Sequence, residues 1–118
     1  QRMGSPVSPF VEFERQVLRI LLRSHMRHEQ IEELLADAAF VSCEHTGVGY
    51  FLTVRHLGLP ASRVVCSEPM LQGRAKDIEC GFVAFLEGGD LTLECHSWGD
   101  LSLPSDLRDR PLTIHAAA

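Results

Sequence analysis

Two short stretches place a cysteine close to a histidine, and these residues could bind a metal. His45 follows Cys43 after one intervening residue, and His96 directly follows Cys95. Thiolate and imidazole groups are common zinc ligands. In a regular strand, however, neighbours such as Cys95 and His96 point to opposite faces, so the two pairs cannot easily meet at one ion. Because Cys-x-x-Cys and His-x-x-x-His spacings are also absent, we predict no metal site and no cofactor.

A cysteine nucleophile is the second chemistry to consider. Such a residue needs a partly exposed thiolate in electropositive surroundings. The four cysteines instead lie in or beside apolar, strand-like runs, and the chain has a formal net charge of −5. Both conditions favour the neutral thiol, and the Gly-x-Ser-x-Gly motif of many hydrolases is absent. The residues thus favour a protein without a cysteine nucleophile over an enzyme of this kind, and we predict that the cysteines, at positions 43, 66, 80 and 95, are reduced.

The composition indicates one globular domain over residues 1–118, with residues 1–8 and 116–118 as flexible ends. The negative net charge argues against nucleic-acid binding, because a phosphate backbone attracts clustered lysine and arginine. No apolar run approaches the roughly 20 residues that cross a bilayer. Residues 1–10 lack the apolar stretch of a signal peptide. We therefore expect a cytoplasmic protein without membrane contact.

The N-terminal part of the chain has the pattern of two helices. Ser8 suits the start of the first helix as an N-cap, and Glu14 and Arg19 suit the dipole near its two ends. A second helix is predicted over residues 29–38. Apolar residues recur at three- and four-residue steps, which gives each helix one buried stripe. The stripes are Phe10, Phe13, Val17, Ile20 and Leu21 in the first helix and Ile31, Leu34, Leu35 and Ala38 in the second.

Residues 81–98 predict a β-hairpin around which a sheet can form. Gly88 and Gly89 separate two strand-like runs, and a Gly-Gly pair tolerates the positive φ angles of a type I′ turn. This turn sets the register, and because side chains alternate between faces, one face is wholly apolar and the other is mixed. The apolar face pairs Leu86 with Leu91, Ala84 with Leu93 and Phe82 with Cys95; the mixed face pairs Glu87 with Asp90, Phe85 with Thr92, Val83 with Glu94 and Gly81 with His96.

A second hairpin is predicted from residues 39–45 and 48–55, with Thr46 and Gly47 as its turn. Threonine is a poor first residue for a type I′ turn. A slip of one residue would exchange the two faces of this hairpin. The predicted register pairs Cys43 with Tyr50 and Val41 with Leu52 on an apolar face, and Ser42 with Phe51, Phe40 with Thr53 and Glu44 with Gly49 on the other.

The remaining chain contains shorter elements. Residues 63–66 and 111–115 predict two short strands, and residues 68–79 are expected to be the longest irregular segment. A single helical turn is expected near Ser105 and Asp106. Short connections favour antiparallel neighbours. The predicted fold class is therefore α+β, with two N-terminal helices packed on one face of an antiparallel sheet of about five or six strands.

The mixed faces of the two hairpins combine into a second sheet face, on the side away from the helices. A face that meets only water does not usually carry several phenylalanines. There are three alternatives for what covers this face: loops of the same chain, a second subunit, or a foreign ligand or protein. The candidate site residues on this face are Phe40, Glu44, Phe51, Phe85, Glu94 and His96.

We predict a non-enzymatic binding domain whose partner is a second copy of the chain, forming a homodimer, or another protein. The alternative is a small-molecule binder or enzyme that uses Glu44, Glu94 and His96 in a pocket roofed by residues 68–79. An enclosed cavity on the second face would favour the alternative, whereas a flat apolar face would favour the interaction domain.

Overall fold

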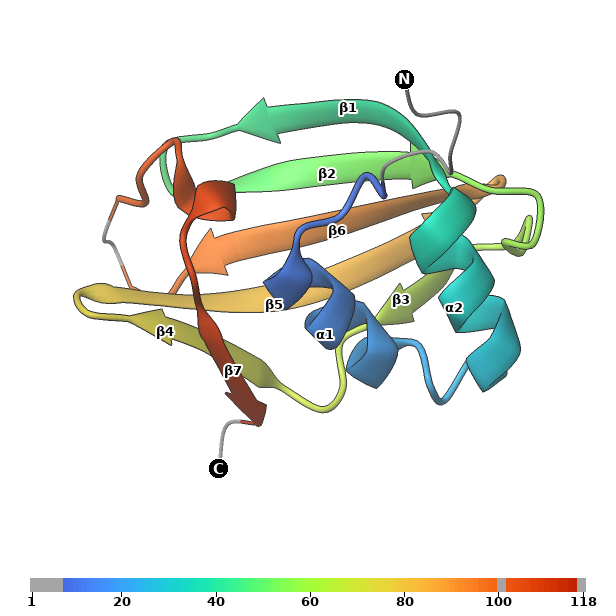
Figure 1. Cartoon of the computed structure of the whole chain (residues 1–118), viewed down its shortest axis with the longest axis horizontal. Coiled ribbons are helices and arrows are strands. Elements are labelled where there is room, and N and C mark those ends of the chain that lie inside the picture. The colour runs from blue at the N-terminus through green and yellow to red at the C-terminus, as the bar shows by residue number, and fades with distance from the viewer. Residues whose placement is uncertain (1–7, 100–101, 117–118) are drawn as a thin grey trace, which may run out of the picture.

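The computed structural model describes residues 8–99 and 102–116, which form two helices against one face of a seven-stranded antiparallel sheet (Figure 1). This arrangement confirms the predicted α+β class, with more strands than expected. Among the described residues, no helix is long and apolar enough to cross a membrane. The elements are α1 Glu12–Leu21, α2 His28–Asp37, β1 Ala39–His45, β2 Gly49–Arg55, β3 Val64–Cys66, β4 Leu71–Ala75, β5 Ile78–Glu87, β6 Asp90–Ser97, a 3-10 turn Leu107–Asp109 and β7 Thr113–Ala116.

The sheet is built around the predicted central hairpin. The strand order is β1-β2-β6-β5-β4-β7. Strands β3 and β4 both pair with the same edge of β5, at different positions along it. Every predicted pair of the β5–β6 hairpin is present, from Glu87 with Asp90 to Gly81 with His96. Gly88 and Gly89 have φ angles of +61° and +84°, which fit the type I′ turn. The predicted register of this hairpin is confirmed.

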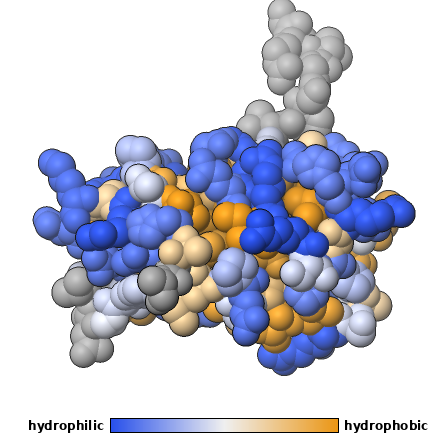
Figure 2. All heavy atoms as spheres, turned by 90° about the horizontal axis from the view of Figure 1, so that it is seen from below, coloured by the Kyte–Doolittle hydropathy of each residue, from blue (hydrophilic) through white to orange (hydrophobic). Residues whose placement is uncertain are grey.

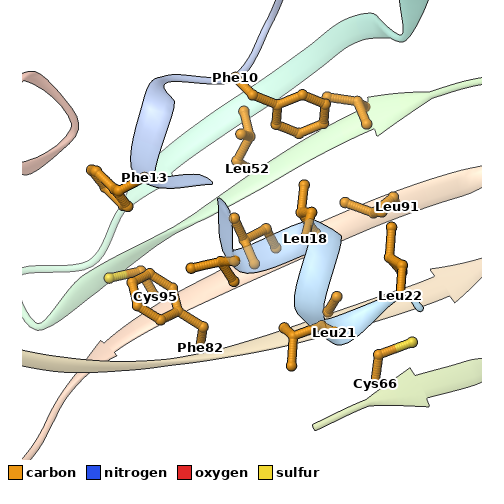
Figure 3. Close-up of a cluster of buried hydrophobic side chains, with 14 of the residues drawn as sticks. Phe10, Phe13, Leu18, Leu21, Leu22, Leu52, Cys66, Phe82, Leu91 and Cys95 are labelled. Carbon is orange, nitrogen blue, oxygen red and sulfur yellow. The ribbon is translucent and has the colours of Figure 1, made fainter. Parts of the chain in front are cut away.

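Helix α1 packs its apolar stripe against the inner face of the sheet (Figure 3). Leu18, Leu21 and Leu22 lie over strand residues that include Leu91 and Phe82, and none of these side chains is more than 3% exposed. Burial of one such side chain contributes about 1.5–3 kcal/mol. This cluster therefore holds the helical layer on one side of the sheet.

The predicted N-cap at Ser8 is wrong, because α1 begins at Glu12 and its N-cap is Val11. The hydroxyl of Ser8 instead donates a hydrogen bond to the carbonyl oxygen of Leu35 at 2.7 Å. This bond ties the segment before α1 to α2. This acceptor is distant in the chain, so a local sequence pattern does not reveal it. A serine before a helix can serve either as its N-cap or as the donor of such a distant hydrogen bond.

Strand β4 lies inside residues 68–79, so the prediction of a long irregular segment there is wrong. Gln72, Gly73 and Arg74 are not strongly strand-forming, but pairing with β5 on one side and β7 on the other satisfies their backbone groups. Lys76, with a φ angle of +48°, lies in the tight turn from β4 to β5. Only residues 67–70 remain as the loop between β3 and β4.

The β1–β2 hairpin has a three-residue connection, residues 46–48, instead of a two-residue turn. Cys43 therefore lies opposite Leu52 and not opposite Tyr50, which is a shift of two residues from the predicted register. The poor fit of threonine to a type I′ turn accounts for the longer connection. Because the shift is even, residues 42–45 keep their predicted faces.

A buried ion pair connects the two ends of the described chain. Glu14 of α1 is fully buried, and its carboxylate accepts hydrogen bonds from Arg108 at 2.7 and 2.9 Å. The Tyr50 hydroxyl of β2 and the backbone nitrogen of Val11 also donate to this carboxylate. The hydrogen bonds with Glu14 raise the pKa of Arg108, and burial raises the pKa of Tyr50. The sequence predicted only a helix-dipole role for Glu14 and did not reveal these contacts.

Replacing Arg108 by alanine should lower the free energy of unfolding by about 3–5 kcal/mol, because the Glu14 carboxylate would stay buried without its counter-charge. Arg110→Ala is the matched control, since Arg110 forms an exposed ion pair with Asp106 and should cost less than about 1 kcal/mol. Urea unfolding followed by circular dichroism measures both changes. Equal losses for the two variants would contradict the structural role of the buried pair.

Candidate functional site

The side of the sheet opposite the helices, here called the outer sheet face, is formed by outward side chains of β1, β2, β6, β5 and β3. Both helices and the 3-10 turn lie on the other side of the sheet (Figure 1), and among the described residues no helix covers the outer sheet face. The register aligns its side chains in rows across the strands. One row is Glu44, Phe51, Glu94 and Val83, and the next is Ser42, Thr53, Thr92, Phe85 and Val65.

Five of the six predicted site residues belong to this face. Phe51, Phe85 and Glu94 lie together near its middle, and each remains partly exposed. Glu44 lies at the β1 edge and is exposed, whereas His96 lies further along β6. Phe85 lies beside Val83 on its own strand and Val65 on β3, whereas Phe51 is separated from it by Glu94 and Thr92 of β6, so the accessible face is mixed, with apolar side chains on both sides of β6.

Phe40 does not join the outer sheet face, contrary to the prediction. A β-bulge between Phe40 and Ser42 pairs Phe40 with Val54 instead of Thr53. Val54 belongs to the buried inner side, and Phe40 is 57% exposed at the β1 edge. A bulge adds one residue to one strand of a pair and thereby changes the faces beyond it. The strand pattern of residues 39–45 contains no signal for this extra residue.

Glu44 and Glu94 do not form an acid/base pair across a shared site. The side chain of Phe51 lies between them, because β2 separates β1 from β6. Neighbouring strands are about 4.8 Å apart, so two such spacings separate the two glutamates. Within residues 8–99 and 102–116, no group of three or more His, Cys, Asp or Glu side chains is placed to hold a metal ion.

Polar contacts bound one end of the outer sheet face. The hydroxyl oxygens of Thr53 and Thr92 lie 3.0 Å apart, and Arg55 forms an ion pair with Asp90 at 2.8 Å. The hydrogen bond from Arg55 lowers the pKa of Asp90. These polar groups are therefore paired with one another: the two threonines lie in the row of Phe85, and Arg55 and Asp90 lie at the end of the face.

A hollow of about 490 Å³, here called the Gly81 pocket, opens toward the other end of this face. It lies between the loop of residues 67–70 and the end of β6, with β5 beneath it. Figure 2 views the molecule from the lower side of Figure 1 and shows hydrophobic residues gathered among hydrophilic ones. The residues that line the pocket are Ser67, Glu68, Pro69, Met70, Leu71, Gly81, Phe82, Val83, His96 and Trp98.

Gly81 allows two rings to approach the strand. A Cβ atom at this position would lie 2.5 Å from Nε1 of Trp98 and 2.8 Å from Nε2 of His96. Such distances are too short for any side chain, so the rings of Trp98 and His96 occupy the space above the glycine. The Nδ1 atom of His96 is buried and has no hydrogen-bond partner among the described residues. This corner of the face is therefore not fully satisfied by its own chain.

The pocket differs from the one expected from the sequence. Of the three residues predicted to share it, only His96 lines it, and Glu44 and Glu94 lie outside it. Its loop wall is formed by residues 67–70, because most of the predicted roof is strand β4. Trp98 is the residue that sequence reasoning missed. Its signal is that the chain's single tryptophan follows His96 by two residues, a spacing that returns to the same face of a strand.

A larger hollow of about 760 Å³ follows the connection from α1 to α2, away from the outer sheet face. Arg19, Arg23 and Arg27 are among the residues that line it. Arg19 already forms an ion pair with Glu32 at 2.8 Å. Cations near the end of α1 complement the helix dipole, which accounts for Arg19 and Arg23 without a ligand.

The cysteines lie in the strands, mostly at buried positions. Cys66, Cys80 and Cys95 are buried, Cys43 is half-buried, and all four are free. Burial raises the pKa of Cys43 and Cys66, and contact with Cys80 together with burial raises the pKa of Cys95. Arg108 lowers the pKa of Cys43 by a smaller amount than burial raises it. None of these three thiols is therefore an activated nucleophile.

Thiol titration should find four free thiols in unfolded, nonreduced protein. In folded protein the thiols should react slowly, because three are buried, and Cys43 should react first. Cys43→Ser should remove that first phase and leave the rest unchanged. A count below four after unfolding would show a disulfide, and rapid reaction of several thiols in folded protein would contradict their burial.

The chain was also compared with known proteins. No protein-family model, no curated protein and no solved structure matches it. The function is therefore argued from the geometry of the outer sheet face.

Proposed function

We propose that this chain is a non-enzymatic interaction domain that self-associates through its outer sheet face. The observation that supports this most directly is the partial exposure of Phe51, Val83 and Phe85 on a face that no described helix covers. Burying one such side chain contributes about 1.5–3 kcal/mol. A partner that covers all three would gain most of its binding free energy there.

The dimensions of the molecule suit such a contact. It extends 38 by 37 Å in the plane viewed in Figure 1 and is 22 Å thick. Stable interfaces bury about 800 Å² on each partner, which a seven-stranded sheet of this width can supply. Two sheets can also pack face to face at about 10 Å, with their apolar side chains interdigitated.

The polar residues favour a second copy of the chain over a foreign partner. A two-fold contact brings the same surface of both subunits together, so residue i of one meets residue j of the other reciprocally. Glu94 and His96 lie two residues apart on β6. In a two-fold contact, Glu94 of each subunit can face His96 of the other, which would provide each carboxylate with a hydrogen-bond donor.

The enzyme that the sequence suggested as an alternative has less support. It required Glu44, Glu94 and His96 in one pocket, but both glutamates lie outside the hollow that His96 lines. Small-ligand binding keeps support from the Gly81 pocket, which is considered separately below.

Light scattering on a sizing column tests self-association. At micromolar concentrations and above, wild-type protein should have twice the chain mass of 13.1 kDa. Phe85→Asp and Phe51→Asp should each reduce the mass to that of one chain without loss of fold, because a carboxylate would enter the centre of the contact. Phe40→Asp is the matched control, since this exposed phenylalanine lies off the face, and it should leave the mass unchanged.

Two results would contradict the proposal. A wild-type monomer at every concentration would exclude self-association. A dimer that Phe40→Asp dissociates, but Phe85→Asp does not, would place the contact at the β1 edge instead of the outer sheet face.

A further inference from the structure

We propose that the Gly81 pocket binds a small organic cation with an aromatic body, such as an aromatic amine in its ammonium form. The pocket is formed by one chain, but Val83 and His96 also belong to the outer sheet face, so self-association would compete with a ligand for these residues. The proposal is carried by the shape of the pocket, the two rings that line it, and its single fixed charge.

The shape is that of a small-molecule site. Its volume of about 490 Å³ lies within the range of ligand pockets, about 300–1,000 Å³. Val83 and the bare backbone of Gly81 contribute to its lining from β5, Met70 from the loop before β4, and Trp98 from the residues just after β6. Met70 is 63% exposed, so its flexible thioether can move to close over a bound ring.

The lining selects the charge of the ligand. Among the described residues that line the pocket, Glu68 is the only carboxylate, and there is no lysine or arginine. An anion would therefore meet a like charge without compensation, whereas a cation would meet Glu68 and the Trp98 indole, whose Nε1 edge lies against Gly81. Cations are attracted to tryptophan rings more strongly than to other aromatic rings.

His96 places hydrogen-bonding nitrogen atoms beside the indole. Its Nε2 atom faces the space above Gly81, while its buried Nδ1 atom has no partner among the described residues. An imidazole whose hydrogen bonds are incomplete can reorient toward an ammonium or hydroxyl group that enters the pocket. The pocket thus combines apolar side chains, the Trp98 indole and acceptors, which matches an aromatic ammonium ion.

The chain provides its own reporter, because Trp98 is its single tryptophan. Titration with benzylammonium should change the fluorescence of Trp98 and saturate in the millimolar range, as expected for a ligand of about eight non-hydrogen atoms. Benzyl alcohol has nearly the same shape without the charge and should bind more weakly. Benzoate should bind weakest of the three, because its carboxylate would approach Glu68.

Two variants test the assignment of the charge. Glu68→Gln should weaken benzylammonium binding by about threefold, which is typical of an exposed ion pair, and leave benzyl alcohol binding unchanged. Glu87→Gln is the matched control, because Glu87 is an exposed carboxylate of β5 that does not line the pocket. It should change neither affinity.

A third variant tests the location. Gly81→Ala should displace the indole, since the added Cβ would lie 2.5 Å from its Nε1 atom, and should abolish binding if the variant folds. The outcome for Glu68→Gln decides the proposal even if Gly81→Ala does not fold. Phe85→Asp should still bind benzylammonium, so this site and the self-association surface can fail separately. No saturable fluorescence change, or equal affinity for benzoate and benzylammonium, would overturn the proposal.

Discussion

The ion pair between Glu14 and Arg108 is the interaction on which the rest of the structure depends. It joins α1 to the segment before β7, and the Tyr50 hydroxyl links both to β2. A buried carboxylate is tolerated only when it is fully paired. Three segments distant in the sequence must therefore meet at one place on the inner face. This contact fixes the helices and the 3-10 turn on that side of the sheet.

The position of the helices on the inner face explains why the outer sheet face is accessible. The helices, the 3-10 turn and the leucine cluster all cover the inner face, so the described chain has no further helix for the outer sheet face. Phe85, Val83 and Gly81 lie on β5 and His96 lies on β6, so the self-association surface and the Gly81 pocket share these two strands, while Phe51 lies on the neighbouring strand β2. Rigid central strands are well suited to present binding residues, because they hold side chains in a defined register.

The sequence predicted what local rules determine. Gly88 and Gly89 allow one tight turn, and from it follow the β5–β6 register, the buried apolar face and the positions of Phe85, Glu94 and His96. Features that depend on distant partners escaped prediction. The bulge that removes Phe40 from the face, the pairing that makes β4 a strand, and the contacts of Glu14 with Arg108 all require knowledge of the fold. Trp98 was missed because its role depends on Gly81 of the neighbouring strand.

Methyl NMR over a range of protein concentrations tests the proposal that two chains meet through the outer sheet face. Valines sample each surface: Val65 and Val83 lie on the outer sheet face, Val41 at the β1 edge, and Val17 and Val54 in the core. The account predicts that the Val65 and Val83 signals shift or broaden as concentration rises, while the others stay constant. Signals that are all independent of concentration, or changes confined to Val41, would contradict it.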